Sequence, residues 1–176
     1  MASIIAHAVC AVAIGESLRR TKMPRHFWWL IAFSAMLPDL DVIGFAHGIE
    51  YGDFLGHRGF SHSILFAAIW AAVITMLAFR EYRMGIFISL FLATASHGVL
   101  DAMTNGGLGI AFLSPFDTTR YFFDFQPIQV SPIGIGAFFS QWGLRVIISE
   151  AIWIGLPCTV LLLLTWTFRK FRPIKD

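Results

Sequence analysis

The chain has 176 residues, of which 57% are hydrophobic and only 14% are charged, and its net charge is +2. Its mean hydropathy is +0.70. A soluble domain carries about a quarter charged residues, so this composition excludes an ordinary soluble protein and indicates one embedded in a membrane. The small net charge gives no sign of a nucleic-acid-binding surface. The length fits a single membrane-embedded domain, residues 1–176.

The first apolar stretch, residues 4–18, reaches with Ala2 and Ser3 the minimum of about 17 residues for a membrane span. No Lys or Arg precedes it, as one would in a cleaved signal peptide, so we expect a retained membrane helix. Glu16 near its end is expected to pair with Arg20, four residues on.

Four further apolar stretches follow in chain order. The second is short and irregular, because Pro38 interrupts it between residues 27–37 and 40–45. The third is preceded by the candidate helix caps Ser61 and Ser63, and the last contains a possible kink at Pro157. These three later stretches are residues 64–79, 84–100 and 142–168. The sequence therefore predicts an all-α, polytopic bundle of about five transmembrane helices.

The charges orient this bundle. Ten of the 13 Lys and Arg residues lie in three segments that follow the first, third and fifth helices, within residues 19–25, 80–83 and 169–175. If the helices alternate in direction, these segments share one side, which the positive-inside rule makes cytoplasmic. We therefore expect the N-terminus outside and the C-terminus in the cytoplasm of a bacterial inner membrane.

Five of the six histidines fall on the opposite, outer side, together with most of the acids. These side chains come from separate parts of the chain: His7, His47, His57, His62 and His97, with Asp39, Asp41, Glu50, Asp53, Asp101, Asp117 and Asp124. His47 is not expected to be a ligand. The gathering of imidazoles and carboxylates at one membrane face predicts a His/Asp site there.

Three motifs supply the candidate ligands. His97 and Asp101 stand four residues apart, which places both on one face of a helix. Asp39 and Asp41 follow Pro38 on an irregular turn, and either is a candidate metal ligand or general base. His7 lies at the matching depth in the first helix.

The third motif, residues 56–63, holds His57 and His62 around Arg58 and forms a loop up to about Ser61. Free N–H groups at the start of the following helix favour an anion, and Arg58 could grip a phosphate with two parallel hydrogen bonds. The outer segment, residues 104–141, is expected to form an aromatic loop or short hairpin over the site. Its Arg120 is a tentative lipid-phosphate contact.

The blocks Leu37-Pro38-Asp39-Leu40-Asp41, His57 to Ser63 and Ser96 to Thr104, in that order, resemble the YdjM-type inner-membrane, metal-dependent hydrolases. Ser114-Pro115 to Arg120-Tyr121 and Pro127-Ile128 resemble that family's closing pattern, so the resemblance runs from His7 to about Ile128. It implies a membrane metal site more strongly than a substrate.

A more distant similarity is to the zinc-dependent phospholipases C, in which an Asp of a His-x-x-x-Asp helix bridges two zinc ions. His7, an aspartate, a further histidine and then His97 and Asp101 follow the same order. Those enzymes carry a further His-x-x-x-Glu pair, whereas no histidine follows Asp101 here. We therefore expect one or two ions, Zn²⁺ or alternatively Mn²⁺.

These observations predict a metal-dependent hydrolase that cleaves a phosphoester of a membrane lipid or lipid-linked molecule. The candidate metal ligands are His7, Asp39, Asp41, His57, His62, His97 and Asp101, with Asp39, Asp41 and Arg58 as catalytic candidates and Arg58 and Arg120 as substrate contacts. Two alternatives stay open: an ion- or proton-coupled transport protein, and a non-catalytic, metal-stabilised membrane scaffold. Apolar inner halves of the third and fourth helices, such as residues 69–79 and 85–92, speak against transport.

Overall fold

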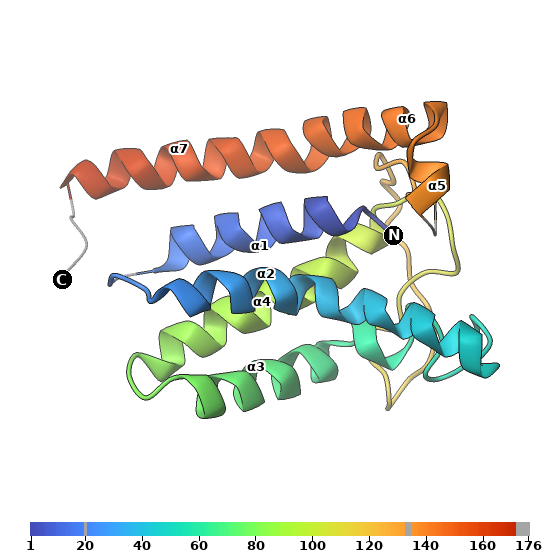
Figure 1. Cartoon of the computed structure of the whole chain (residues 1–176), viewed down its shortest axis with the longest axis horizontal. Coiled ribbons are helices and arrows are strands. Elements are labelled where there is room, and N and C mark those ends of the chain that lie inside the picture. The colour runs from blue at the N-terminus through green and yellow to red at the C-terminus, as the bar shows by residue number, and fades with distance from the viewer. Residues whose placement is uncertain (20, 133–134, 172–176) are drawn as a thin grey trace.

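The computed structural model describes residues 1–19, 21–132 and 135–171. Five long helical rods lie side by side in it, joined by short connections at one end and by long loops at the other (Figure 1). The rods are α1 (Ile4–Leu18), α2 (Arg25–Met36) continued by η1 (Leu37–His47), α3 (Ile64–Ala78), α4 (Arg83–Ala102), and α6 (Gln141–Glu150) continued by η3 (Ala151–Gly155) and α7 (Leu156–Phe171). The short helices η2 (Phe60–His62) and α5 (Ile135–Phe138) lie in the loops.

This architecture confirms the predicted all-α bundle. In the described part of the chain the only extended pairings are two isolated bridges, Thr104 with Ile128 and Ile110 with Tyr121. Both bridges lie in the long segment between α4 and α6, where a loop or hairpin was expected. Of the two candidate caps, Ser63 is the one that caps α3, since its hydroxyl accepts the N–H of Phe66 at 3.0 Å.

Three helical rods are long and apolar enough to cross a membrane: Arg25–His47, Arg83–Ala102 and Gln141–Phe171. The other two, Ile4–Leu18 and Ile64–Ala78, are shorter apolar helices. The second rod is irregular, as expected, because Pro38 stands where the α-helix gives way to a 3₁₀-helix. The last rod carries a π-helical turn, Ala151–Gly155, just ahead of Pro157, whose ring cannot supply the backbone N–H that a regular helix needs there.

Small residues allow the first four rods to pack closely. Ala11, Ala71 and Ala93 are fully buried in a core with the larger side chains of Phe27 and Leu90. Helix–helix contact in a membrane depends on such close backbone approach, because lipid tails are as apolar as the core.

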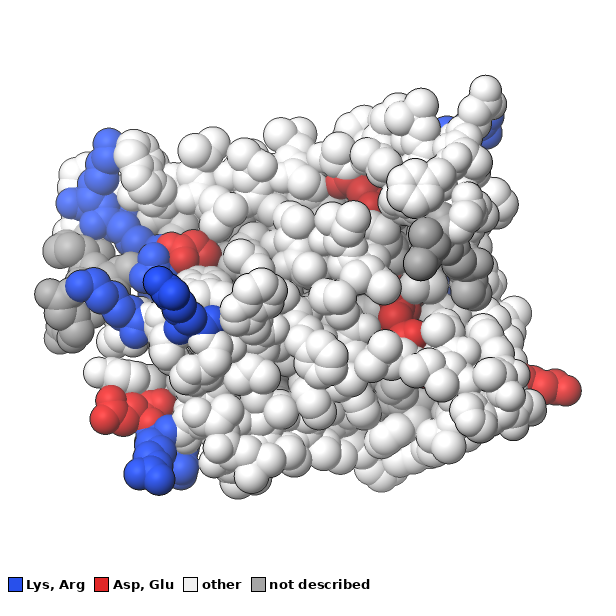
Figure 2. All heavy atoms as spheres, viewed as in Figure 1, with Lys and Arg blue, Asp and Glu red and all other residues white. Residues whose placement is uncertain are grey.

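The two ends of the bundle differ in charge. The N-terminus, η1 and the end of α4 lie at one end (Figure 1), whereas Lys and Arg gather at the other end, where α7 finishes (Figure 2). There the Glu16 carboxylate accepts from Arg19 Nε at 2.6 Å and also bonds Arg169. Arg20, the partner expected for Glu16, lies outside the described residues. The gathering of Lys and Arg at this end agrees with the sequence-based prediction, which left Arg58 and Arg120 on the side of the His/Asp site.

Candidate metal centre

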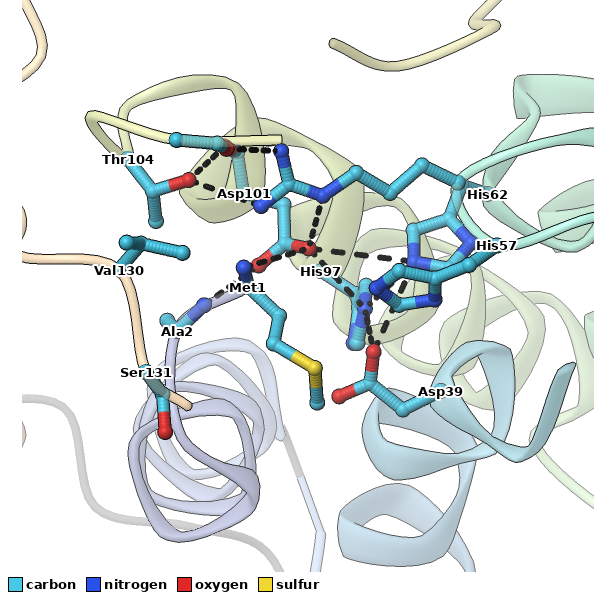
Figure 3. Close-up of polar contacts among 12 residues, drawn as sticks. Met1, Ala2, Asp39, His57, His62, His97, Asp101, Thr104, Val130 and Ser131 are labelled. Carbon is cyan, nitrogen blue, oxygen red and sulfur yellow. Dashed lines mark hydrogen bonds and ion pairs between the residues drawn. The ribbon is translucent and has the colours of Figure 1, made fainter. Parts of the chain in front are cut away.

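Four buried side chains converge at the end of the bundle near the N-terminus (Figure 3). Asp39 comes from η1, His62 from η2, and His97 and Asp101 from α4, and each offers a ligand atom within 4.8 Å of the others. His97 and Asp101 do share one face of α4, as their spacing predicts. Segments up to 62 residues apart in the chain therefore meet in one cluster rich in metal-ligand atoms.

The two histidines present their Nε2 atoms to each other. The Nδ1 atom of His97 lies 2.6 Å from the carbonyl oxygen of Ala35, which can only accept, so Nδ1 carries a proton. His62 Nδ1 faces Asp41 Oδ2 at 3.2 Å and Ser61 Oγ at 3.0 Å. The two Nε2 atoms are 3.0 Å apart. With a proton fixed on each Nδ1, a metal that displaces any proton from Nε2 would find both Nε2 atoms as ligands.

Asp39 supplies a buried carboxylate whose ion-pair partners among the described residues are the two imidazoles of the cluster. Its side chain is 3% exposed, yet neither oxygen has a hydrogen-bond partner. Oδ1 lies 3.3 Å from His97 Nε2 and 3.8 Å from His62 Nε2. A buried carboxylate is costly unless it is paired or coordinates a metal, so these orphaned oxygens are consistent with a cation.

The distances fit a small divalent ion. Ligands at about 2.0 Å from a tetrahedral Zn²⁺ lie about 3.3 Å from one another. The Asp101 Oδ2 atom is 3.9 Å from His62 Nε2 and 4.0 Å from His97 Nε2, and its closest partner is Arg58 Nε at 3.2 Å. Shortening its two distances to the imidazoles by about 0.6–0.7 Å would bring Asp101 Oδ2 to the tetrahedral ligand spacing.

Asp41 differs from Asp39 because donors surround it. Its carboxylate accepts from His57 Nδ1 at 2.7 Å, from Ser61 Oγ at 2.6 Å and from the N–H of Arg58 at 3.2 Å. Asp41, His57 and His62 also form a second group of ligand type. The hydrogen bonds suit Asp41 to orienting His57 and His62, as carboxylates do behind metal-binding imidazoles.

His62 is the titratable group at the junction of the two clusters. Burial alone would lower the pKa of His62, but the neighbouring carboxylates of Asp39 and Asp41 raise it to about 9. The carboxylates thus surround His62 with negative charge, the environment that also favours a bound cation.

His7 lies against the cluster from α1. Its ring stacks on that of His97, with centroids 3.7 Å apart, and its Nε2 is 3.3 Å from Asp101 Oδ1. Neither ring nitrogen has a hydrogen-bond partner, although the side chain is fully buried. His7 therefore lies at the depth in the bundle that the sequence predicts, beside the cluster. His47 stands outside the cluster, with Nδ1 3.1 Å from its own helix at Ile43 O.

Arg58 is fully buried and bound to protein atoms. Its Nε lies 3.2 Å from Asp101 Oδ2, and its terminal nitrogens donate to Gly106 O at 2.6 Å and Thr104 Oγ1 at 2.9 Å. Its backbone has φ +65°, a left-handed conformation that is uncommon outside glycine. A Cβ on Gly107 would lie 2.5 Å from Arg58 Nη1, so this turn needs a glycine. The guanidinium thus connects Asp101 to the turn after α4, and the expected phosphate contact stays a prediction.

Arg120 likewise binds backbone carbonyls. It donates to His57 O at 2.8 Å and to Tyr51 O at 3.0 Å, and its guanidinium lies over the Tyr51 ring. Arg120 therefore connects the segment after α4 to the loop that carries His57 and Arg58. Its expected contact with a lipid phosphate is not tested by this arrangement and stays a prediction.

Several contributors to the site have no strong sequence signal. The Ala2 N–H donates to Asp101 Oδ1 at 2.7 Å, and Glu150 on α6 accepts from both the N–H and the hydroxyl of Ser3. Glu150 is a lone acid in an apolar stretch, which is a weak hint of such a buried role. Gly98 allows η2 to approach α4, because a Cβ there would lie 3.1 Å from His62 O.

The fold and the site define a multi-pass helical membrane protein with a buried His/Asp cluster at one end. The sequence matches the family of YdjM inner membrane proteins over residues 1–173, and the chain belongs to that family. It is 35% identical to the inner membrane protein YbcI of Escherichia coli K12 over 173 residues, covering 97% of this chain and 100% of the relative. No solved structure matches the chain. The family membership confirms the predicted relationship and the inner membrane as its location.

Proposed function

We propose that the protein is a metal-dependent hydrolase of the inner membrane that cleaves a phosphoester of a lipid or lipid-linked substrate. The observation that supports it best is the convergence of His62, His97 and Asp101 on the orphaned carboxylate of Asp39. The two imidazoles pair with Asp39 and Asp101 only at 3.3–4.0 Å, and neither Asp39 oxygen accepts a hydrogen bond, so the four side chains leave room for a cation among them.

Asp39, His62, His97 and Asp101 would hold one divalent ion, with Zn²⁺ favoured by two imidazoles and two carboxylates. A second ion would use His7 beside Asp101, or the His57 side of the cluster. Such an ion supplies Lewis acidity toward a phosphoryl oxygen and lowers the pKa of bound water.

The residues around the ion have separable tasks in this proposal. The second oxygen of Asp39 is the better candidate for accepting a proton, because the oxygens of Asp41 are already occupied by three donors. Asp41 instead fixes the rings of His57 and His62. Arg58 holds Asp101 in place through its Nε atom.

We also propose that this end of the bundle faces outward, with the N-terminus outside and the C-terminus in the cytoplasm. The basic residues at the opposite end support this orientation through the positive-inside rule (Figure 2).

Buried hydroxyls speak against the transport alternative. Ser34, Ser89 and Thr94 each donate to a carbonyl of their own helix, so they offer no continuous chain of exchangeable protons toward the basic end. A cluster confined to one end of the bundle suits hydrolysis better than passage across the bilayer.

The test is metal content of the detergent-purified protein, followed by hydrolysis of phospholipids in mixed micelles. We expect about one or two zinc ions per chain in the wild type and in a His47→Ala control, whose imidazole lies outside the cluster. His97→Ala and the double variant His57→Ala/His62→Ala should lose both metal and hydrolysis. A folded wild type without metal, or a double variant that keeps both properties, would refute the proposal.

A further inference from the structure

An apolar groove on the bundle includes Asp39 of the candidate metal centre in its lining. It has a volume of about 370 Å³ and lies between α1 and the α2–η1 rod, bordered by Ser131, Pro132 and Phe138 of the later loop. Its walls come from Ile4, Ile5, Phe33, Met36, Leu40 and Val42. This set of side chains is called the acyl groove below.

Three residues with polar side chains line the groove among its apolar walls. They are Asp39, Ser3 and Ser131, and the Asp39 oxygens accept no hydrogen bond. Figure 3 shows the Asp39 carboxylate between the imidazole cluster and the side where Ser131 lies. One carboxylate is thus shared by the groove and the metal centre.

Part of the apolar wall, Phe33 and Met36, extends from Asp39 along α2 toward the basic end of the bundle. Phe33 precedes Asp39 by six residues, which is about 9 Å along a helix. Ile5 and Leu40 are 66% and 48% exposed on the outside of the bundle. In a bilayer this outer surface meets lipid chains, so an acyl chain can enter the groove sideways without passing through water.

The neighbouring cleft at Glu150 differs because the polar group that lines it already has hydrogen-bond partners. It too is mostly apolar, with walls that include Val9 and Ile147, but the Glu150 oxygens already accept from Ser3. Its polar group is therefore satisfied, whereas that of the acyl groove is not. A ligand with an apolar chain and a polar head fits the acyl groove better.

We propose that the acyl groove binds one hydrocarbon chain of a membrane lipid and directs the polar head of that lipid to Asp39. The inference rests on the proposed function, for which it specifies the substrate as a lipid taken from within the membrane. The apolar walls recognise the chain through burial of hydrocarbon, and the cation at Asp39 would attract an anionic head group.

The experiment uses the full-length protein in vesicles of phosphatidylethanolamine with a small fraction of phosphatidylglycerol that carries a photoactivatable diazirine on one acyl chain. After irradiation, peptide mass spectrometry locates the adducts. We expect the peptide with Phe33 and Leu40 to be labelled at least threefold more than the peptide with Leu77, which is 80% exposed on α3 and has the same lipid around it. An Ile5→Trp variant should remove most of this excess, and a Leu77→Trp variant should not.

Equal labelling of the two peptides, or an excess that Ile5→Trp leaves intact, would overturn the groove. Ile5 is exposed, so its replacement is expected to leave folding unchanged. Metal content measured on the same samples separates the two proposals. If the protein holds metal but shows no preferential labelling, only the proposal of the acyl groove is refuted. If it shows preferential labelling without metal, the acyl groove is supported and the proposed hydrolase is refuted.

Discussion

Replacing Asp39 and Asp41 separately by Asn should give opposite results for metal binding and for stability of the metal-free protein. Asp39→Asn removes a proposed ligand and weakens the ion pairs of Asp39 Oδ1 with His97 Nε2 at 3.3 Å and His62 Nε2 at 3.8 Å, but it breaks no short hydrogen bond. We therefore expect metal content to fall to background. The melting temperature of the metal-free protein should fall less than in Asp41→Asn, since these contacts are longer than the hydrogen bonds that Asp41 accepts from His57 and Ser61.

Asp41→Asn should lower the stability of the metal-free protein and only weaken metal binding. Its two oxygens accept from His57, Ser61 and the Arg58 N–H, and an amide group places an NH₂ against at least one of these donors. One buried, unsatisfied donor costs about 1–3 kcal/mol. At about 2–4 °C per kcal/mol for a chain of this size, the metal-free protein should melt about 2–12 °C lower. Metal affinity should fall about 10–100-fold, as expected for a partner behind the ligands.

The assay is thermal unfolding in detergent after treatment with a chelator, together with zinc titration of each variant. Asp53→Asn is a matched control, because Asp53 is an exposed acid in the same loop region and belongs to neither cluster. If Asp39→Asn destabilised the metal-free protein more than Asp41→Asn, or if Asp39→Asn kept full zinc affinity, the division into ligand and orienting residue would be refuted.

Three further outcomes are expected. Removing metal from the wild type with a chelator should lower its melting temperature by about 5–10 °C, because a ligand at 100-fold its Kd contributes about 2.7 kcal/mol. Added Zn²⁺ should restore the melting temperature. An unchanged melting temperature would speak against a metal that binds only the folded state. Glu150→Leu should destabilise the protein by about 1–3 kcal/mol in the same melting assay, since Ser3 loses the acceptor of its N–H and hydroxyl, whereas Glu150→Gln should cost less. A cysteine at the exposed position Glu50 should react with a membrane-impermeant maleimide in cells with a permeabilised outer membrane. A cysteine at the exposed position Arg80 should react only after the inner membrane is lysed. The reverse pattern would invert the proposed orientation.

The sequence was sufficient for the features that follow from periodicity and hydropathy. His97 and Asp101 share a face of α4 because the helical repeat fixes their relation, and Pro38 marks the irregular second rod because its ring excludes a regular helix. The gathering of the candidate ligands at one end follows from alternation of the helices across a membrane.

The separate roles of Asp39 and Asp41 could not be predicted in this way. Residues two apart on a 3₁₀-helix point in different directions, and what each one meets depends on segments that are distant in sequence. Asp41 faces donors from the loop 16–20 residues later, whereas Asp39 faces His97 on α4. The role of Glu150 could not be predicted either, since its partner Ser3 is 147 residues away in the sequence.

The two arginines bear on how an anionic substrate would be held. Both looked suited to a phosphate in the sequence, because an exposed guanidinium next to a metal site often binds one. Arg58 instead meets Asp101, Gly106 and Thr104, and Arg120 meets backbone carbonyls. With these groups engaged, binding of a phosphoester head would depend mainly on the cation beside Asp39. It follows from the proposed function that removal of the metal should weaken the binding of the lipid head group as well as abolish turnover, whereas the acyl groove should still hold the chain.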